Sequence, residues 1–223
     1  MSTVAKSRAE QGGVAGPHIA GAALRRVPVQ QRSAERVNRM LDACAALLDE
    51  IGYAKLTTTL IAQRADVAIG SVYQFFGDKR AVVRALDMRY LDGYIERLSR
   101  RIANTTAEHW SQIVDEVIDE YISMHRTEPG FRTLHFGDIV DVHLLDSERS
   151  NDDVLTDRLH AMLSEHFPLG DERQVSLALT VAVTAGDALV KLAFRRDPDG
   201  DDVVLTEAKT LIRDYLERHI ATG

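Results

Sequence analysis

The chain has 223 residues, 45% of them hydrophobic, and carries a formal net charge of −7. A chain of this length and composition is expected to bury a sizeable core and to form two linked helical domains. Its single cysteine, Cys44, excludes an intrachain disulfide and fits a reducing cytoplasm; since it lies between Leu41 and Leu48, core packing is expected rather than a redox switch.

The charge is unevenly distributed along the chain. Residues 1–90 contain 13 Lys and Arg against 8 Asp and Glu, a balance of +5, whereas the remainder has a balance of −12. This asymmetry indicates that the first third meets a polyanion while the rest has another role. No secretory signal is apparent, and the most apolar run, 174–186, is too short to span a bilayer. We therefore expect a soluble, cytoplasmic protein without a membrane partner.

The N-terminal 31 residues are rich in Gly, Ala and polar residues and lack helical periodicity, which predicts a flexible basic tail. Alternatively, Arg25, Arg26 and Arg32 could reach phosphates or the minor groove of a bound duplex. Apolar residues then recur at three- and four-residue steps as far as Gly52. This pattern predicts a helix with Ser33 as its N-cap.

The next stretch, 57–79, reads TTTLIAQRADVAIGSVYQFFGDK and predicts two short helices around a tight turn at 64–67. Thr57 and Thr58 are natural N-caps for the first helix. Asp66 falls where the chain must reverse, and Asp enters the left-handed region at modest cost. The second helix is expected from about Ala68 to Phe76. This arrangement is typical of a helix-turn-helix, whose second helix enters the DNA major groove.

These residues resemble the DNA-binding domain of the tetracycline-repressor (TetR) family of transcriptional regulators. The family pattern is matched in register over 23 residues at Thr57-Thr58, Ile61-Ala62, Ala65, Val67, Gly70, Val72-Tyr73, Phe76 and Lys79. The chain departs from the pattern at Asp66, Ala68 and Phe75, where the family usually has Gly, Ser, and His or Tyr. Because Ala caps a helix about 0.5–2 kcal/mol less well than Ser, the second helix is expected to begin loosely.

The resemblance implies roles for side chains in this stretch. The predicted DNA-binding set has Thr58, Ser71, Tyr73 and Lys79 near the sugar-phosphate backbone and Thr59, Ala68, Ile69, Gly70 and Gln74 facing the bases. Thr57 belongs to the set without an assigned contact. Gln74 could pair with adenine and Ile69 could contact a thymine methyl. The alternatives are a half-buried core aromatic for Tyr73 and a solvated helix-start lysine for Lys79. With few hydrogen-bonding groups on this helix, methyl contacts and DNA shape are expected to carry much of the specificity.

The rest of the chain predicts only helices. Asp78 is expected to cap a long helix over 79–103, followed by helices over 109–126, 131–145, 154–167, 171–195 and 206–220, with loops at 147–152 and 197–202. The prediction is an all-α fold with a tail over 1–31, a three-helix helix-turn-helix DNA-binding domain over 32–78, and an effector-binding and dimerisation domain over 79–223.

The helix over 171–195 is apolar nearly all round and must therefore be covered on every side. Its small residues permit close approach of another helix, and the family it resembles dimerises through its last two long helices. The predicted homodimer interface comprises Ala178, Ala182, Ala185, Leu189, Leu205, Leu211 and Leu216.

An effector pocket between helices needs apolar walls and a few polar anchors. The candidates are Tyr90, Tyr94, Trp110, Tyr121, Phe131, Phe136, Met162 and Asp187, although most of them could equally be ordinary core. A lone Asp187 would be costly in a buried helix. Lys191, one turn later, could pair with it, which is the alternative to a role in the pocket or the dimer seam.

No metal or cofactor is expected. His135, Asp138, Asp141 and His143 are suitable ligand types, but on one helix Asp141 and His143 would point about 200° apart. The run 197–202 is read as an acidic turn, since Ala208 stands where a calcium loop needs glutamate.

The leading hypothesis is a homodimeric, ligand-responsive regulator, a repressor released from a palindromic DNA operator by a small, largely apolar molecule. An activator of the same architecture, a helical-bundle enzyme and a protein-binding scaffold are the alternatives. An enzyme is disfavoured because the sequence offers no nucleophile-base pair or phosphate loop.

Overall fold

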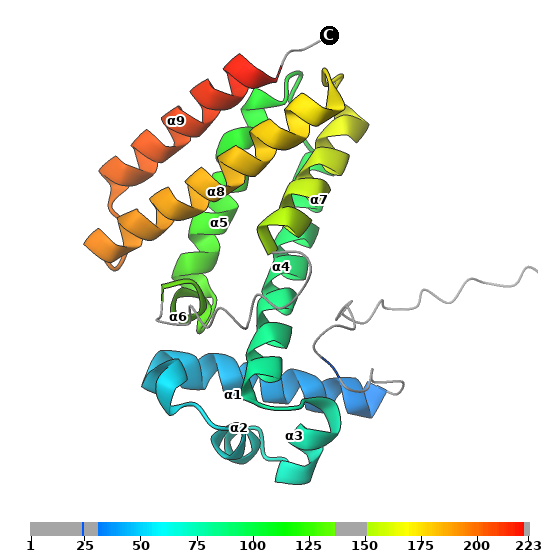
Figure 1. Ribbon diagram of the computed structural model, residues 1–223, viewed down its shortest axis with the longest axis vertical. Helices are drawn as coiled ribbons and strands as arrows, with labels where there is room; N and C mark the ends of the chain where they lie inside the picture. The colour runs from blue at the N-terminus through cyan, green and yellow to red at the C-terminus, as the bar shows by residue number, and fades with distance from the viewer. Residues whose placement is uncertain (1–23, 25–30, 137–150, 221–223) are drawn as a thin grey trace, which may run out of the picture.

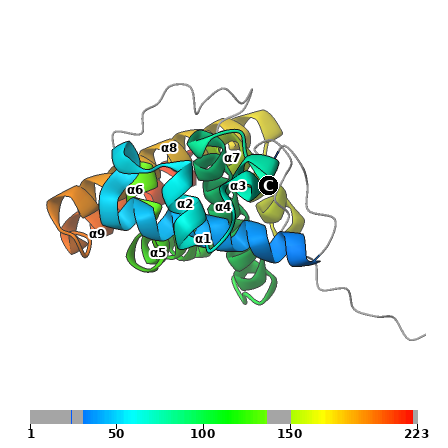
Figure 2. The ribbon, with the colours of Figure 1, turned by 90° about the horizontal axis from the view of Figure 1, so that it is seen from below.

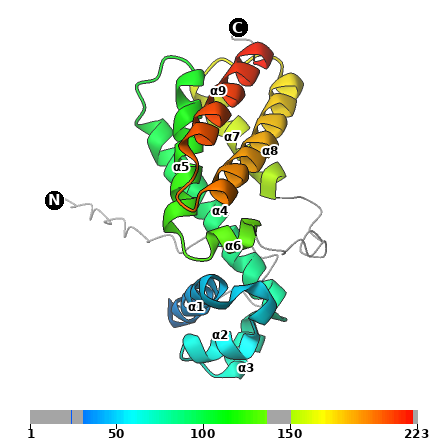
Figure 3. The same ribbon diagram turned by 90° about the vertical axis from the view of Figure 1, so that its left-hand side faces the viewer.

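The structure, a computed structural model, describes residue 24, residues 31–136 and residues 151–220 (Figure 1). In chain order its helices are α1 Gln31–Lys55, α2 Thr58–Arg64, α3 Ile69–Phe75, α4 Lys79–Ala103, α5 Ser111–Thr127, α6 Phe131–Phe136, α7 Asn151–His166, α8 Glu172–Arg196 and α9 Asp202–His219. No strand occurs in these ranges, and the predicted all-α class is confirmed. The first three helices form one end of the molecule and α8 and α9 the other, with α4 joining them (Figures 1 and 3).

Helix α1 is the brace of the small N-terminal unit. It begins at Gln31, so Ser33 lies within the first turn and the predicted N-cap is wrong. Gly52 interrupts the helix with φ 71° and ψ 167°, where the sequence predicts a stop. Cys44 is fully buried, and desolvation raises the pKa of its thiol to about 12. The thiol therefore stays protonated, which confirms a packing role.

Helix α4 connects the two ends and has the predicted bounds. The Asp78 carboxylate accepts a hydrogen bond from the Ala81 N–H at 2.9 Å, which confirms the predicted cap. Near its middle, the Arg89 guanidinium pairs with Asp42 of α1 at 2.7 Å. Further along, the Tyr94 hydroxyl donates to the Val117 carbonyl of α5 at 2.8 Å. One continuous helix therefore contacts both units.

Two predicted loops are shorter than the sequence suggests. Helix α7 begins at Asn151 and takes Asp152 into its first turn, where an acidic side chain complements the helix dipole, so that end of the predicted loop is wrong. Helix α9 begins at Asp202 rather than Thr206, because the Asp201 carboxylate caps it by accepting from two backbone N–H groups at 3.1 and 3.2 Å. The remaining acidic residues form the predicted turn.

The turn between α5 and α6 lies against α1. Gly130 has φ +73°, and a Cβ added there would lie 2.7 Å from the backbone oxygen of Ala45. Only glycine fits this conformation at this separation. On its other side the same segment is tied to the α8–α9 turn, since the Arg126 and Arg132 guanidiniums donate to the carbonyls of Asp199 and Pro198 at 2.9 and 2.6 Å.

Helix α8 is long and apolar enough, by length and composition alone, to cross a membrane, a test that core helices also pass. It packs against α7 and α9, and only 33% of its most apolar stretch is buried. Within the described residues, no group of three or more His, Cys, Asp or Glu is placed to hold a metal ion. The side chain of His135, and Asp138, Asp141 and His143, lie outside those residues.

Candidate nucleic-acid interface and effector site

The first helix of the predicted helix-turn-helix is capped by Thr57, whose hydroxyl accepts from the Leu60 N–H at 3.2 Å. Thr58 is not a cap. Its hydroxyl instead shares a hydrogen bond of 3.1 Å with the hydroxyl of Tyr73, which links α2 to α3. This contact joins two residues that the resemblance assigns to the DNA backbone.

The turn between α2 and α3 has the predicted conformation. Asp66 has φ 52°, in the left-handed region. Behind the turn, Ile61, Val72 and Phe76 are fully buried and fix the angle between the two helices. The helix pair is therefore held as one small rigid unit at the lower end of the molecule (Figure 1).

Helix α3 is one residue shorter at each end than predicted. Ala68 makes no side-chain cap bond, as its short side chain predicts, so α3 begins with only backbone hydrogen bonding. Ile69 and Tyr73 are 41% and 49% exposed, and Gly70 and Gln74 are exposed beside them. These four positions form one outward face. Tyr73 exposes about half of its surface there, and its hydroxyl is held by Thr58.

Lys79, the first residue of α4, is not simply solvated. Its ammonium group donates to the Tyr53 carbonyl at 3.1 Å and lies 4.3 Å from the centroid of the Tyr53 ring. The side chain therefore ties the start of α4 to the end of α1, close to the helix-turn-helix.

The structure brings several of the predicted effector residues together. Ring centroids are 5.4 Å apart for Tyr90 and Phe131, 6.0 Å for Tyr94 and Tyr121, and 5.8 Å for Tyr121 and Phe131. These are edge-to-face contacts, the favoured geometry of aromatic pairs. The four rings form one aromatic cluster where α4, α5 and α6 meet.

A polar chain adjoins this cluster. The Tyr121 hydroxyl donates to Asp187 at 2.6 Å, and the Lys191 ammonium pairs with the other carboxylate oxygen at 2.6 Å, which confirms the predicted pairing. Burial first, and then the Asp187 charge, raise the pKa of the Tyr121 phenol well above its ordinary value. The phenol therefore remains a donor, and Asp187 is not left without compensation.

Trp110 and Met162, two other members of the predicted effector set, do not join the four rings. Met162 packs against both core clusters of the chain. Trp110 is buried in a second core cluster with Ile102 and Phe167. Met162 accepts a hydrogen bond from Ser99 at 3.1 Å. The side chain of Phe136 lies outside the described residues.

Two residues beside the aromatic cluster were not predicted from the sequence: His125, which contacts Phe131, and Phe194, which stacks on His125. His125 is 1% exposed, stacks on Phe194 with centroids 5.0 Å apart, and meets Phe131 edge-on at 4.8 Å. The available signal was its position four residues after Tyr121, on the same face of α5.

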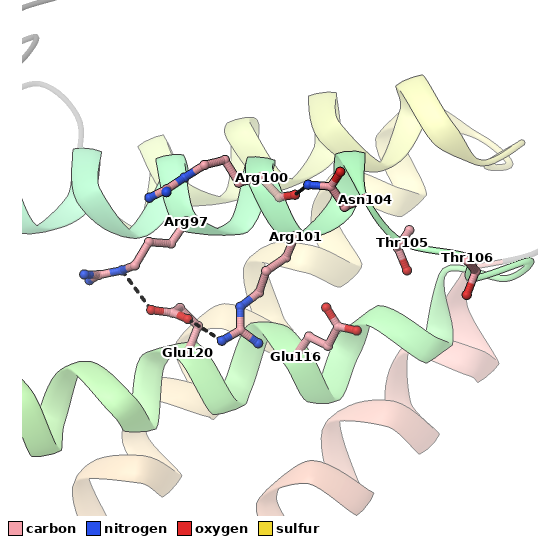
Figure 4. Close-up of a pocket in the computed structure, with 8 residues that line it drawn as sticks. All are labelled: Arg97, Arg100, Arg101, Asn104, Thr105, Thr106, Glu116 and Glu120. Atoms are coloured by element: carbon pink, nitrogen blue, oxygen red, sulfur yellow. Dashed lines mark hydrogen bonds and ion pairs between the residues drawn. The ribbon is translucent and has the colours of Figure 1, made fainter.

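A polar cleft of about 760 Å³ opens between the end of α4 and α5 (Figure 4). In it, Glu120 is nearly buried and pairs with Arg97 and Arg101 at 2.8 and 3.0 Å. The other lining residues are Arg100, Asn104, Thr105, Thr106 and Glu116. None of these belongs to the predicted effector set, and the paired charges bind α4 to α5.

The structure buries some residues of the predicted dimer interface and exposes others. Ala178, Ala182, Leu205 and Leu216 are 2–7% exposed and face the interior of the single chain. Ala185 and Leu189 are half-buried, and Leu211 is 52% exposed. Three residues outside the set, Leu177, Val181 and Leu192, are 65%, 40% and 37% exposed along α8.

Two short helices fixed by a buried core, with the second presenting an exposed face, define a helix-turn-helix DNA-binding protein. Two family models match the chain: "Bacterial regulatory proteins, tetR family" over residues 40–86, and "Tetracyclin repressor-like, C-terminal domain" over residues 108–220. The chain belongs to the TetR family and is a DNA-binding transcriptional regulator. This family consists of regulators rather than enzymes.

Individual relatives agree with this assignment. A TetR-family regulator from Streptomyces coelicolor, of known crystal structure, is 42% identical, with 82% of this chain and 99% of that chain covered and a TM-score of 0.71. The regulator HbdR of Aromatoleum sp. is 35% identical over 72 residues, 32% of this chain and 31% of its own. The repressor KstR of Rhodococcus jostii is 44% identical over 45 residues, 20% of this chain and 21% of its own. The chain thus matches a third or less of these two curated relatives.

Proposed function

We propose that the protein is a cytoplasmic, homodimeric repressor that occupies a near-palindromic operator and leaves it when a small, largely apolar molecule binds. The observation that carries the DNA part is the outward face of α3. Ile69, Gly70, Tyr73 and Gln74 are exposed together on a helix whose opposite side is anchored in the core. We assign DNA binding to residues 32–78 and effector binding and dimerisation to residues 79–223.

The exposed side of α8 supports a dimer. Leu177, Val181 and Leu192 lie four and eleven residues apart, so at about 100° per residue they share one helix face. An apolar stripe of this kind on a helix surface is typical of an association site. A second copy packed on it would supply the second reading helix, which two DNA half-sites about 34–36 Å apart require. We therefore shift the proposed interface from the buried alanines to this stripe and Leu211.

The aromatic cluster supports an apolar effector. It lies at the junction of α4, α5 and α6, and Tyr121 with Asp187 supplies a polar anchor at its edge. A ligand that fits only one position of α4 would shift the population between DNA-competent and released forms. Repression rather than activation is favoured by the similarity to KstR, a transcriptional repressor.

The direct test is a gel shift with DNA from around the protein's own gene, at a stated salt concentration. We expect specific binding at least about 10³-fold tighter than binding to random duplex. Binding no tighter than to random duplex would count against the proposed operator.

Two substitutions should distinguish a residue that contacts the DNA backbone from a residue that recognises bases. Lys79→Ala is expected to weaken binding to every duplex and to flatten the salt dependence, because a phosphate contact carries no sequence information. Gln74→Ala is expected to relax preference at one or two base pairs, by about 1–3 kcal/mol each. Affinity measurements on an operator and its single-base variants distinguish the two, and identical behaviour would refute the division. Since Lys79 also holds Tyr53, its variant needs an accompanying thermal unfolding curve.

A further inference from the structure

Three arginines line one side of the first half of α1. Arg32, Arg36 and Arg39 are spaced by four and three residues, so they share a face over about 10 Å of helix. Arg32 and Arg39 are exposed and Arg36 is partly so. None of the three forms an ion pair or side-chain hydrogen bond with another described residue, whereas Arg64 and Arg89 of the same unit are paired. We call these three side chains the α1 arginine rail.

The direction of the rail follows from two ion pairs that fix the sides of α1. Asp42 pairs with Arg89 and marks the side toward α4. Glu50 pairs with Arg64 at 2.6 Å and marks the side toward the end of α2. At about 100° per residue, all three rail positions lie within about 40° of the Glu50 direction. The rail therefore lies on the helix-turn-helix side of α1.

Beside the N-terminal part of α1 lies neither α2 nor α3. Seen from below, the start of α1 extends past both helices (Figure 2). The rail lies within the first nine of the 25 residues of α1, which begins at Gln31. The carboxylate within the same stretch, Glu35, lies about 60° away from the Glu50 direction, on the Asp42 side. The rail is therefore a cationic edge beside the reading unit.

We propose that the α1 arginine rail binds phosphates of the duplex that flank each half-site, outside the bases read by α3. Each DNA strand carries one phosphate per about 3.4 Å of axis, so about 10 Å of rail spans three of them. Guanidinium groups match phosphate oxygens bidentately. The inference rests on the proposed operator binding and extends its footprint.

The test is the salt dependence of operator affinity in the full-length triple variant Arg32→Gln/Arg36→Gln/Arg39→Gln. Its matched control is Arg100→Gln/Arg158→Gln/Arg173→Gln, which removes the same charge from exposed positions on α4, α7 and α8. With about 0.9 per phosphate and six contacts per dimer, the slope of log K against log salt should fall by about 5 in the rail variant. Discrimination between the operator and single-base variants should stay unchanged, and the control should keep both properties.

Hydroxyl-radical footprinting gives a second readout, because protection of the deoxyriboses should disappear at the flanking nucleotides and persist over the α3 contacts. If the triple variant fails to fold, single variants, each with an expected slope change of about 2, carry the same test. If the wild type prefers its operator and the rail variant keeps the wild-type salt slope, the proposed phosphate contacts of the rail are wrong and operator binding stands. If the wild type binds all duplexes equally and the rail variant loses salt slope, the proposed operator is wrong instead. If the wild type binds no duplex, both proposals are wrong.

Discussion

Leu177→Arg is expected to convert the protein into monomers and to abolish tight operator binding in the same step. Leu177 is 65% exposed on α8, in line with Val181 and Leu192. At a two-fold interface each residue occurs twice, so one substitution places two guanidinium groups in the apolar seam. Burying a charge without a partner costs far more than the lost contact of one leucine contributes.

The effect on DNA follows from the loss of the second half-site. Two linked half-site contacts commonly exceed one by about 10²- to 10⁴-fold, and a monomer forfeits this factor. Sedimentation equilibrium measures the change in assembly, and a gel shift at fixed salt measures the change in affinity. Leu211→Arg, on the exposed side of α9, should act in the same direction.

Ser164→Arg is the matched control, because it adds the same charge at an exposed position of α7. It should remain dimeric and bind as the wild type does. A Leu177→Arg protein that stays dimeric with unchanged operator affinity would show that the α8 stripe is not the seam.

The helix-turn-helix could be predicted closely because its determinants are local. A cap such as Thr57 satisfies an N–H three residues away, and Asp66 needs only its own backbone conformation. The cap at Asp78 is equally local. Interactions of this kind are encoded within a few positions, so a single sequence displays them.

Contacts between distant elements could not be found in this way. The bonds from Lys79 to the Tyr53 carbonyl and from Arg132 to the Pro198 carbonyl join residues whose sequence spacing carries no periodic signal. The apolar circumference of α8 predicts cover on every side, whereas within the chain only 33% of its most apolar stretch is buried. Which side turns inward depends on how α7 and α9 pack, so Ala178 proved to be interior and Leu177 exposed.

The turn between α5 and α6 provides the second large expected effect. Gly130→Ala should destabilise the protein by about 2–5 kcal/mol, the sum of left-handed strain of about 1–2 and crowding of about 1–3. Crowding is expected because the new methyl group would lie 2.7 Å from the Ala45 oxygen and 3.2 Å from the Leu48 side chain. In a chain of this length the melting temperature should fall by about 5–15 °C.

Two other glycines separate these contributions. Gly52 has φ +71° with nothing within 4 Å, so Gly52→Ala should show the strain alone, about 1–2 kcal/mol. Gly93 lies inside α4 with an ordinary φ and open space around it, so Gly93→Ala should be neutral or stabilising by up to about 1 kcal/mol. Denaturant unfolding at one fixed protein concentration measures all three, because dimerisation makes stability depend on concentration.

The ranking of these variants also tests the contact between the two ends of the molecule. If Gly130→Ala costs no more than Gly52→Ala, the α5–α6 turn yields without resistance and does not press on α1. If Gly130→Ala costs clearly more, the α5–α6 turn is tightly packed between α1 and the α8–α9 turn. Arg126 and Arg132 bond this segment to the α8–α9 turn. In that case a displacement of α8 or α9 at the proposed dimer interface would be passed through the α5–α6 turn to α1, which packs against the helix-turn-helix. This path would act in addition to the one along α4.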